Sequence, residues 1–286
     1  MQRHHMMQER PLAPRDYDLA VGWWGWNWEP PVPMSVTELL AAGNLDARTA
    51  ALAWLVLEAH GSLLIAAEPP HSGKTTTLTA FLDFLPNGTR RVFIRGWSET
   101  FDYLSQTKPE RTILLANELS SHLPVYLWGP KAVRVFRTLR RGYALGSTLH
   151  ADSAEEALAQ LTGELGVSAA DLALVDLLAV MRIYGTSRGG IARRLVSLHE
   201  VDGRVPLGDW DQATDTHTHD DAAQLELLCK RRRQPAEVLR EELARRSTHL
   251  DGLVARRVRA IPAVRASLAA YRGESARVGM RGDPTE

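Results

Sequence analysis

The sequence predicts an α/β fold in which a mainly parallel β-sheet carries helices on both faces. Short apolar runs alternate with longer amphipathic stretches along most of the chain. The run at 111–118 is nearly continuous in apolar residues, as expected for a parallel strand that is buried on both faces. The strand-like run at 62–67 leads directly into Gly-Lys-Thr and a helical pattern.

The composition sets broad limits on function. The chain has 286 residues, of which 44% are hydrophobic, which is enough for one large or two modest domains. Its 34 basic and 34 acidic residues cancel, so nucleic acid is an unexpected partner. The single cysteine excludes a disulfide framework or a Cys₄ zinc site within the chain. The single cysteine also fits a reducing, cytoplasmic setting. No apolar run approaches the ~20 residues needed to span a bilayer.

Residues 1–33 are expected to form a mobile tail followed by a Trp- and Pro-rich segment. The sequence GWWGWNW at 22–28 holds four of the eight tryptophans. Such a cluster could anchor a partner or a membrane interface. We favour the alternative that it folds back onto the domain as a strap.

The first helices are predicted from their ends. Ser35 and Glu38 have the spacing of a capping box, and Gly43 ends the helix that they begin. A second helix is expected over 46–60, where Gly61 ends it. Further helices are expected after Lys74, from Gly129 to Gly142, and after a cap formed by Ser153 and Glu156. The buried parallel strands are expected at 62–67, 90–95, 111–118 and 143–150.

The pattern changes after Asp176. Two apolar runs around a turn at 187–190 predict a β-hairpin, and 205–210 predicts a further strand. We expect a nucleotide-binding domain over 34–220, a small helical unit over 221–272 and a tail over 273–286. The sequence HTHDD at 217–221 has metal-like spacing, but we expect a polar loop there, because the nearby sequence suggests no third ligand.

The sequence EPPHSGKTTT at 68–77 is the strongest chemical signal. Strand, tight turn, Gly-Lys-Thr and helix form the context of a phosphate-binding P-loop. We expect ATP to bind at Ser72, Gly73, Lys74, Thr75 and Thr76, with Lys74 on the phosphates and Thr75 on Mg²⁺. The match has a defect, since Glu68 stands where the pattern G-x-x-x-x-G-K-[ST] has glycine and Pro69 cannot donate an N–H. An ordinary turn that carries Gly-Lys-Thr is the alternative.

Two more residues are candidates for catalysis. Glu118 ends the apolar run at 111–118, where an acidic group could hold Mg²⁺ or orient the attacking water. Its alternative is a strand-end carboxylate at the surface. His150 follows the strand at 143–150 and should emerge at the same sheet edge, close to the γ-phosphate. Taken alone, a histidine there is more often structural.

In order, these segments resemble the motor ATPases of type II and type IV secretion, pilus and archaellum systems. KPERTILLANEL resembles their Walker B segment, with Glu118 as its acid, and GYALGSTLHADSAEEAL resembles their His box, with His150 as its signature residue. The resemblance covers roughly 33–272. It implies a RecA-like ATPase domain, a hexameric family and a membrane platform protein as partner. A full-length secretion ATPase is the other partner that it suggests, within a homo- or hetero-oligomer at the inner face of the membrane.

The chain departs from that family pattern at several places. The acidic box after the second strand is replaced by Arg95, Gly96 and Trp97, with Glu99 as the nearest acid, and Ser120 stands where an arginine is usual. Only about thirty residues precede the predicted domain, so we expect the family's N-terminal domain to be missing and no closed hexamer to form alone. We therefore expect a slow ATPase. The alternatives are a non-hydrolysing regulatory subunit of such a motor and a DNA-transfer motor.

Overall fold

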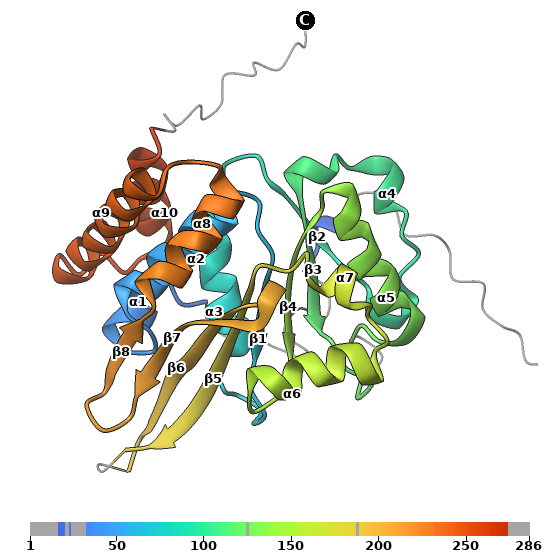
Figure 1. The fold of residues 1–286 in the computed structure, drawn as a ribbon, viewed down its shortest axis with the longest axis horizontal. Coiled ribbons are helices and arrows are strands. Elements are labelled where there is room, and N and C mark those ends of the chain that lie inside the picture. The colour runs from blue at the N-terminus through green and yellow to red at the C-terminus, as the bar shows by residue number, and fades with distance from the viewer. Residues whose placement is uncertain (1–16, 21–22, 24–32, 124–125, 187–188, 274–286) are drawn as a thin grey trace, which may run out of the picture.

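The computed structural model describes residues 17–20, 23, 33–123, 126–186 and 189–273. Within these residues a single eight-stranded sheet has the order β2-β3-β4-β1-β5-β6-β7-β8 (Figure 1). The strands are β1 Leu63–Ala66, β2 Arg90–Phe93, β3 Thr112–Glu118, β4 Ala144–Leu149, β5 Leu177–Gly185, β6 Ile191–Glu200, β7 Val205–Asp211 and β8 Thr216–His219. The predicted α/β class with a mainly parallel sheet is confirmed.

The strands from β2 to β5 are parallel, and their order brings distant segments together. Strand β4 lies between β1 and β3: Leu63 is in register with Gly146, and Leu115 pairs with the same glycine from the other side. Strand β5 pairs with the free side of β1. The carboxyl ends of β3, β4 and β1 therefore lie next to one another at one edge of the sheet.

The remaining strands are antiparallel. Strands β5 and β6 form the predicted hairpin, and β7 forms the predicted further strand. The prediction of a polar loop at 217–221 is wrong, because Thr216–His219 forms strand β8, which pairs with β7. Its alternating polar residues carry no apolar signal, since it is an edge strand with a solvated face.

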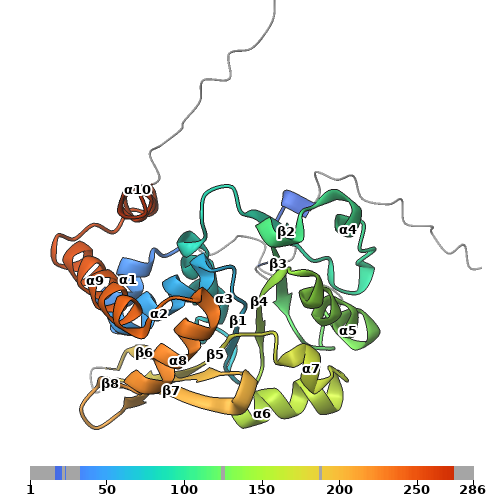
Figure 2. The same cartoon turned by 45° about the horizontal axis from the view of Figure 1, so that its top comes forward.

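Helices cover both faces of the sheet. They are α1 Val36–Ala41, α2 Ala47–Glu58, α3 Lys74–Phe81, α4 Tyr103–Gln106, α5 Gly129–Thr138, α6 Ala154–Ala159, α7 Ala169–Leu172, α8 Asp221–Arg232, α9 Ala236–Ala255 and α10 Ile261–Tyr271. In both views, α5 and α7 lie to the right of β4 and β1, whereas α2 and α8 lie to their left (Figures 1 and 2).

Successive residues of the central strands point into different cores. Leu63 and Ile65 of β1 belong to the core under α1, α2 and α3, whereas Leu64 and Ala66 belong to the core under α5 and α6. This alternation is the period of two of a β-strand, with both faces apolar because both are covered. It explains why 63–67 and 113–116 are uninterrupted apolar runs.

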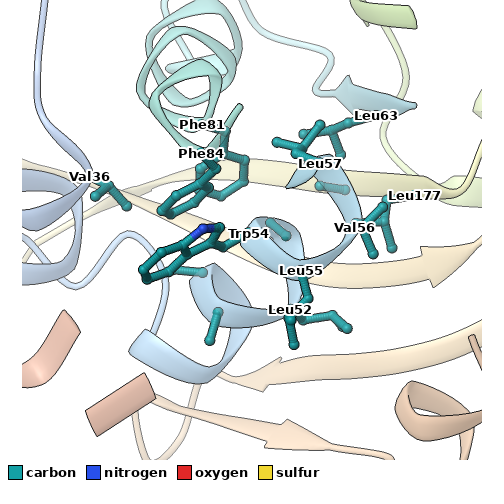
Figure 3. Close-up of a cluster of buried hydrophobic side chains, with 14 of the residues drawn as sticks. Val36, Leu52, Trp54, Leu55, Val56, Leu57, Leu63, Phe81, Phe84 and Leu177 are labelled. Carbon is teal, nitrogen blue, oxygen red and sulfur yellow. The ribbon is translucent and has the colours of Figure 1, made fainter. Parts of the chain in front are cut away.

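The larger core is centred on Trp54 of α2 (Figure 3). Its indole stacks on Phe84, with ring centroids 5.5 Å apart and planes inclined by 5°. The guanidinium of Arg246 on α9 lies 4.4 Å from the centre of the same indole. The helices α8, α9 and α10 thus share one core with α2, so they pack on the sheet domain through apolar and cation–π contacts.

The start of the chain supports the strap at one residue. Trp23 is 3% exposed, and its indole N–H donates to the Thr79 hydroxyl over 3.0 Å. The other tryptophans of 22–28 lie outside the described residues. So do both predicted tails, except for residues 17–20, 23, 33 and 273. No helix within the described part of the chain is long and apolar enough to cross a membrane.

Candidate nucleotide-binding site

The loop between β1 and α3 makes a tight turn. His71 and Gly73 have positive φ angles of 61° and 94°. Gly73 adopts the left-handed conformation at the position before the first helical residue, Lys74. The chain therefore enters α3 abruptly, and the unsatisfied N–H groups of its first turn face the end of β1.

Lys74 is held within this loop. Its ammonium donates to the Ala67 carbonyl over 2.8 Å and lies 3.4 Å from His150 Nδ1. The residue is 7% exposed. Burial lowers the pKa of Lys74, although the nearby Glu118 and Glu68 carboxylates act in the opposite direction. A buried ammonium with only a neutral acceptor is well placed to gain an anionic partner.

Glu118 is aimed by an irregularity in its strand. The register between β3 and β4 shifts between Ala116 and Glu118, so a bulge at Asn117 redirects the following side chain. Glu118 is 5% exposed. One of its carboxylate oxygens lies 3.1 Å from His150 Nε2. This hydrogen bond raises the pKa of His150, while burial acts against it.

His150 connects the loop to the acid. Its Nδ1 lies 2.7 Å from the carbonyl oxygen of Glu68, while Nε2 faces Glu118. The structure thus brings together Lys74, Glu118 and His150 at the carboxyl ends of β1, β3 and β4, as the strand pattern predicted. Their chemical roles remain predictions.

A cleft of about 910 Å³ opens over this cluster. All five residues expected to bind ATP line it, and so do Glu118 and His150. Ser72 is 1% exposed, and within the described structure its hydroxyl has no hydrogen-bond partner. The residues present fit a nucleotide with Mg²⁺: an orphaned hydroxyl and a lysine for phosphate, and oxygens of Thr75 and Glu118 for the cation.

Sequence reasoning missed the contribution of the β5–β6 hairpin to the cleft. Arg193 and Arg194 of β6 line it. Arg193 Nε donates to the His71 carbonyl over 2.9 Å, and its Cδ would lie 3.1 Å from a Cβ at Gly73. Arg194 is occupied by a bidentate pair with Asp215, at 2.7 and 2.9 Å. The sequence could not show this, because it does not reveal the order of the strands. The β5–β6 hairpin reaches the loop before α3 because β5 pairs with β1.

Glu99 is the nearest acid after β2, but it does not line the cleft. One carboxylate oxygen accepts from the Tyr17 hydroxyl over 2.7 Å and from the Phe101 N–H over 2.6 Å. The other accepts from the Arg95 N–H over 2.9 Å. Glu99 therefore holds its own loop together and lies 2% exposed within it.

The predicted histidine pair at 217–219 is held by other groups. His219 Nε2 lies 2.7 Å from an Asp46 carboxylate oxygen, and His217 Nε2 lies 3.0 Å from the Leu195 carbonyl. Both contacts bind β8 to neighbouring elements. The expectation that this pair holds no metal stays a prediction.

No family model matches this chain. It is 30% identical over 202 residues to the uncharacterized protein MJ0900 of Methanocaldococcus jannaschii, a match that covers 60% of this chain and 34% of that protein. A second uncharacterized protein of that organism, MJ1287, is 27% identical over 184 residues, covering 58% of this chain and 67% of that protein. The chain thus spans about a third of the length of MJ0900.

Among solved structures, the chain overlays on the VirB11 ATPase of the Brucella suis type IV secretion system with a TM-score of 0.36 and 19% identity, covering 54% of this chain and 52% of that one. The Legionella pneumophila ATPase DotB gives a TM-score of 0.42 and 14% identity, covering 86% of this chain and 64% of that one. The assignment of the site above depends on the geometry of this chain.

Proposed function

We propose that this protein binds ATP with Mg²⁺ in the cleft above Lys74 and hydrolyses it slowly, as a RecA-like ATPase of the secretion and pilus motor type. The observation that carries the proposal is the convergence of Lys74, Glu118 and His150 on a tight turn at a helix N-terminus. The three residues are far apart in the sequence. Only the parallel strand order brings them together, at the sheet edge where α/β proteins bind ligands.

Each residue has a role that its position supports. Lys74 exchanges its contact with the Ala67 carbonyl for a phosphate oxygen, and the backbone N–H groups from Ser72 to Thr76, in the turn and at the start of α3, bind the same group. Thr75 and Glu118 would hold Mg²⁺, which supplies charge neutralisation at the phosphates. Glu118 can orient a water for attack, and His150 is placed to contact the terminal phosphate.

A non-hydrolysing regulatory subunit is the second candidate. The observation that favours it is the segment after β2, where Arg95, Gly96 and Trp97 replace acids and Glu99 is bound within its own loop. A site that lacks one preorganised charged group commonly loses about 10²–10³ in rate. In either case the proposed partner is a membrane platform protein or a full-length secretion ATPase, on the cytoplasmic side of a membrane.

Calorimetry with Mg·ATP tests the proposal. Lys74→Ala should weaken binding by about 10–100-fold, because it removes hydrogen bonds from a charged donor to phosphate. Lys131→Ala, on α5 outside the cleft, is the matched control and should bind as the wild type does. Equal affinity of Lys74→Ala and wild type would place the nucleotide elsewhere.

Turnover separates the two candidates. We expect the wild type to hydrolyse ATP well below the enzyme median of ~10 s⁻¹. A slow rate that Glu118→Gln lowers further supports the ATPase. Binding with no turnover above that of Glu118→Gln supports the regulatory subunit.

A further inference from the structure

His122 adds a third ligand atom to the pair formed by Glu118 and His150. One side-chain ligand atom of each of these residues lies within 4.8 Å of the others. Their rings and carboxylate come from the end of β3, the segment that follows it and the end of β4. The rings of His122 and His150 have centroids 6.0 Å apart.

The tautomer of His150 follows from its contacts. A carbonyl oxygen cannot donate a hydrogen bond, so the 2.7 Å contact with the Glu68 carbonyl requires a hydrogen on Nδ1. In the neutral ring, Nε2 then carries a lone pair, and it faces a Glu118 carboxylate oxygen at 3.1 Å. The lone pair of Nε2 and the carboxylate oxygen would repel each other at that distance. A second proton or a metal cation must therefore lie between His150 Nε2 and Glu118.

Several features of this arrangement match a cation rather than a proton alone. A histidine that ligates a metal usually donates its other ring N–H to a backbone carbonyl, as His150 does to Glu68. Two atoms that each lie about 2.0–2.2 Å from one zinc ion are about 3–3.5 Å apart, which is the separation of His150 Nε2 and Glu118. His122 is exposed, so its side chain can close on the ion without any rearrangement of the core.

We propose that Glu118, His122 and His150 bind one zinc-class divalent cation, with a fourth position open toward the cleft. Two imidazoles and one carboxylate are a typical ligand set of zinc sites that keep one position for water or substrate. Mg²⁺ is excluded from this ligand set, because it requires oxygen ligands. The site goes beyond the proposed function, since it needs no nucleotide.

The shared carboxylate gives this site a consequence. A Glu118 carboxylate that completes a zinc site with His122 and His150 has less charge to offer Mg²⁺ beside the P-loop, and the zinc ion repels a second cation there. Bound zinc should therefore weaken Mg·ATP binding, or hydrolysis, in proportion to its occupancy. A phosphate or hydroxide at the open position would offset the charge of the cation close to Lys74.

Zinc titration without nucleotide tests the proposal. The protein should carry His4→Ala and His5→Ala as a background, so that the terminal histidines cannot contribute. We expect one equivalent of zinc, with His122→Ala losing more than about 100-fold in affinity, because the loss of a ligand should exceed the ~10–100-fold loss seen when a residue that only orients a ligand is replaced. His249→Ala, a histidine on α9, is the matched control. Cobalt in place of zinc should give a visible absorption spectrum that His122→Ala and Glu118→Gln abolish.

The outcomes are distinct from those of the ATP experiments. Absence of stoichiometric zinc binding, or equal affinity in His122→Ala and His249→Ala, would overturn the proposed zinc site. Because zinc titrations contain no nucleotide and the ATP titrations contain no zinc, either proposal can fail while the other stands. His122 is exposed, so its replacement should leave the circular dichroism spectrum unchanged and keep the comparison valid.

Discussion

Arg193 lines the cleft with a guanidinium that no carboxylate of the described residues neutralises. No carboxylate of the described chain lies within ion-pair distance of it, and its one side-chain hydrogen bond is to the His71 carbonyl. Its neighbour Arg194 is neutralised by Asp215. Arg193 therefore brings a cation to the phosphate loop from a part of the sequence more than a hundred residues away.

Arg193→Ala should weaken Mg·ATP binding by about tenfold, which is about 1.4 kcal/mol. The physical reason is the loss of a charge-assisted hydrogen bond to phosphate. Calorimetry measures it, with Arg182→Ala as the control, because Arg182 lies on β5 and donates to the Asp152 carbonyl instead. Unchanged affinity in Arg193→Ala would separate the hairpin from the nucleotide site.

The central residues of the site could be predicted from the sequence, whereas those at its rim could not. Glu118 ends β3, His150 directly follows β4 and Lys74 begins the helix after β1, and parallel strands place all three positions at one edge. Arg193 and His122 follow no such rule. The position of Arg193 depends on which strand pairs with β1, and that of His122 on an irregular segment after β3.

At the scale of the elements, helix α2 and strand β8 are joined through one carboxylate. Asp46 caps α2 by accepting from the Thr49 N–H over 2.9 Å, and its other oxygen contacts His219 at 2.7 Å. Burial pushes the pKa of Asp46 upward, but the hydrogen bonds with His219 and Thr49 outweigh it and lower the pKa from 3.8 to about 2.

This cap should make stability depend on pH in acid. A carboxyl pKa that is lower in the folded protein contributes stability above the unfolded value, near pH 4, and loses it as the pH falls toward 2. Between pH 5 and 2.5, the free energy of unfolding measured in urea should therefore fall less steeply for Asp46→Asn than for wild type. Parallel curves for the two proteins would contradict the link.

The N-terminal cap of α1 and strand β8 show where sequence patterns are strong and where they are weak. The capping box of Ser35 and Glu38 is a local signal, and it is confirmed. Strand β8 was missed because its four residues are polar and partly exposed, so its existence depends on pairing with β7. Helix caps could be predicted from neighbouring residues, but an edge strand of this kind could not.

For the whole molecule, one partly buried ion pair joins the C-terminal helices to the sheet domain. Arg246 of α9 is 4% exposed and donates to both oxygens of Glu58 on α2, over 2.7 and 2.9 Å. It also donates to Glu242 over 2.7 Å. The contact spans the boundary drawn at residue 221, so the helical unit and the domain are coupled.

Arg246→Ala should lower the free energy of unfolding by about 3 kcal/mol, the lower end for a buried pair, because Glu58 is only partly buried and keeps Arg232 as a partner. Chemical denaturation measures this loss. Arg245→Ala is the control at the adjacent position: the Arg245 side chain itself is exposed, and the change should stay within about 0.5 kcal/mol. Equal effects of the two variants would mean that the pair does not couple the helices to the domain.

The position of β1 at the centre of the sheet also constrains how the chain can fold. Leu63 pairs with Gly146 on one side and with Leu177 on the other, so β1 has no strand neighbour until much later segments are made. Closing such long loops precedes any gain from pairing, which slows folding. A nascent chain would expose β1 and its apolar flanks until β4, and then β5, has been made. Refolding followed by tryptophan fluorescence should therefore take milliseconds to seconds or longer, and a microsecond phase of full amplitude would rule this order out.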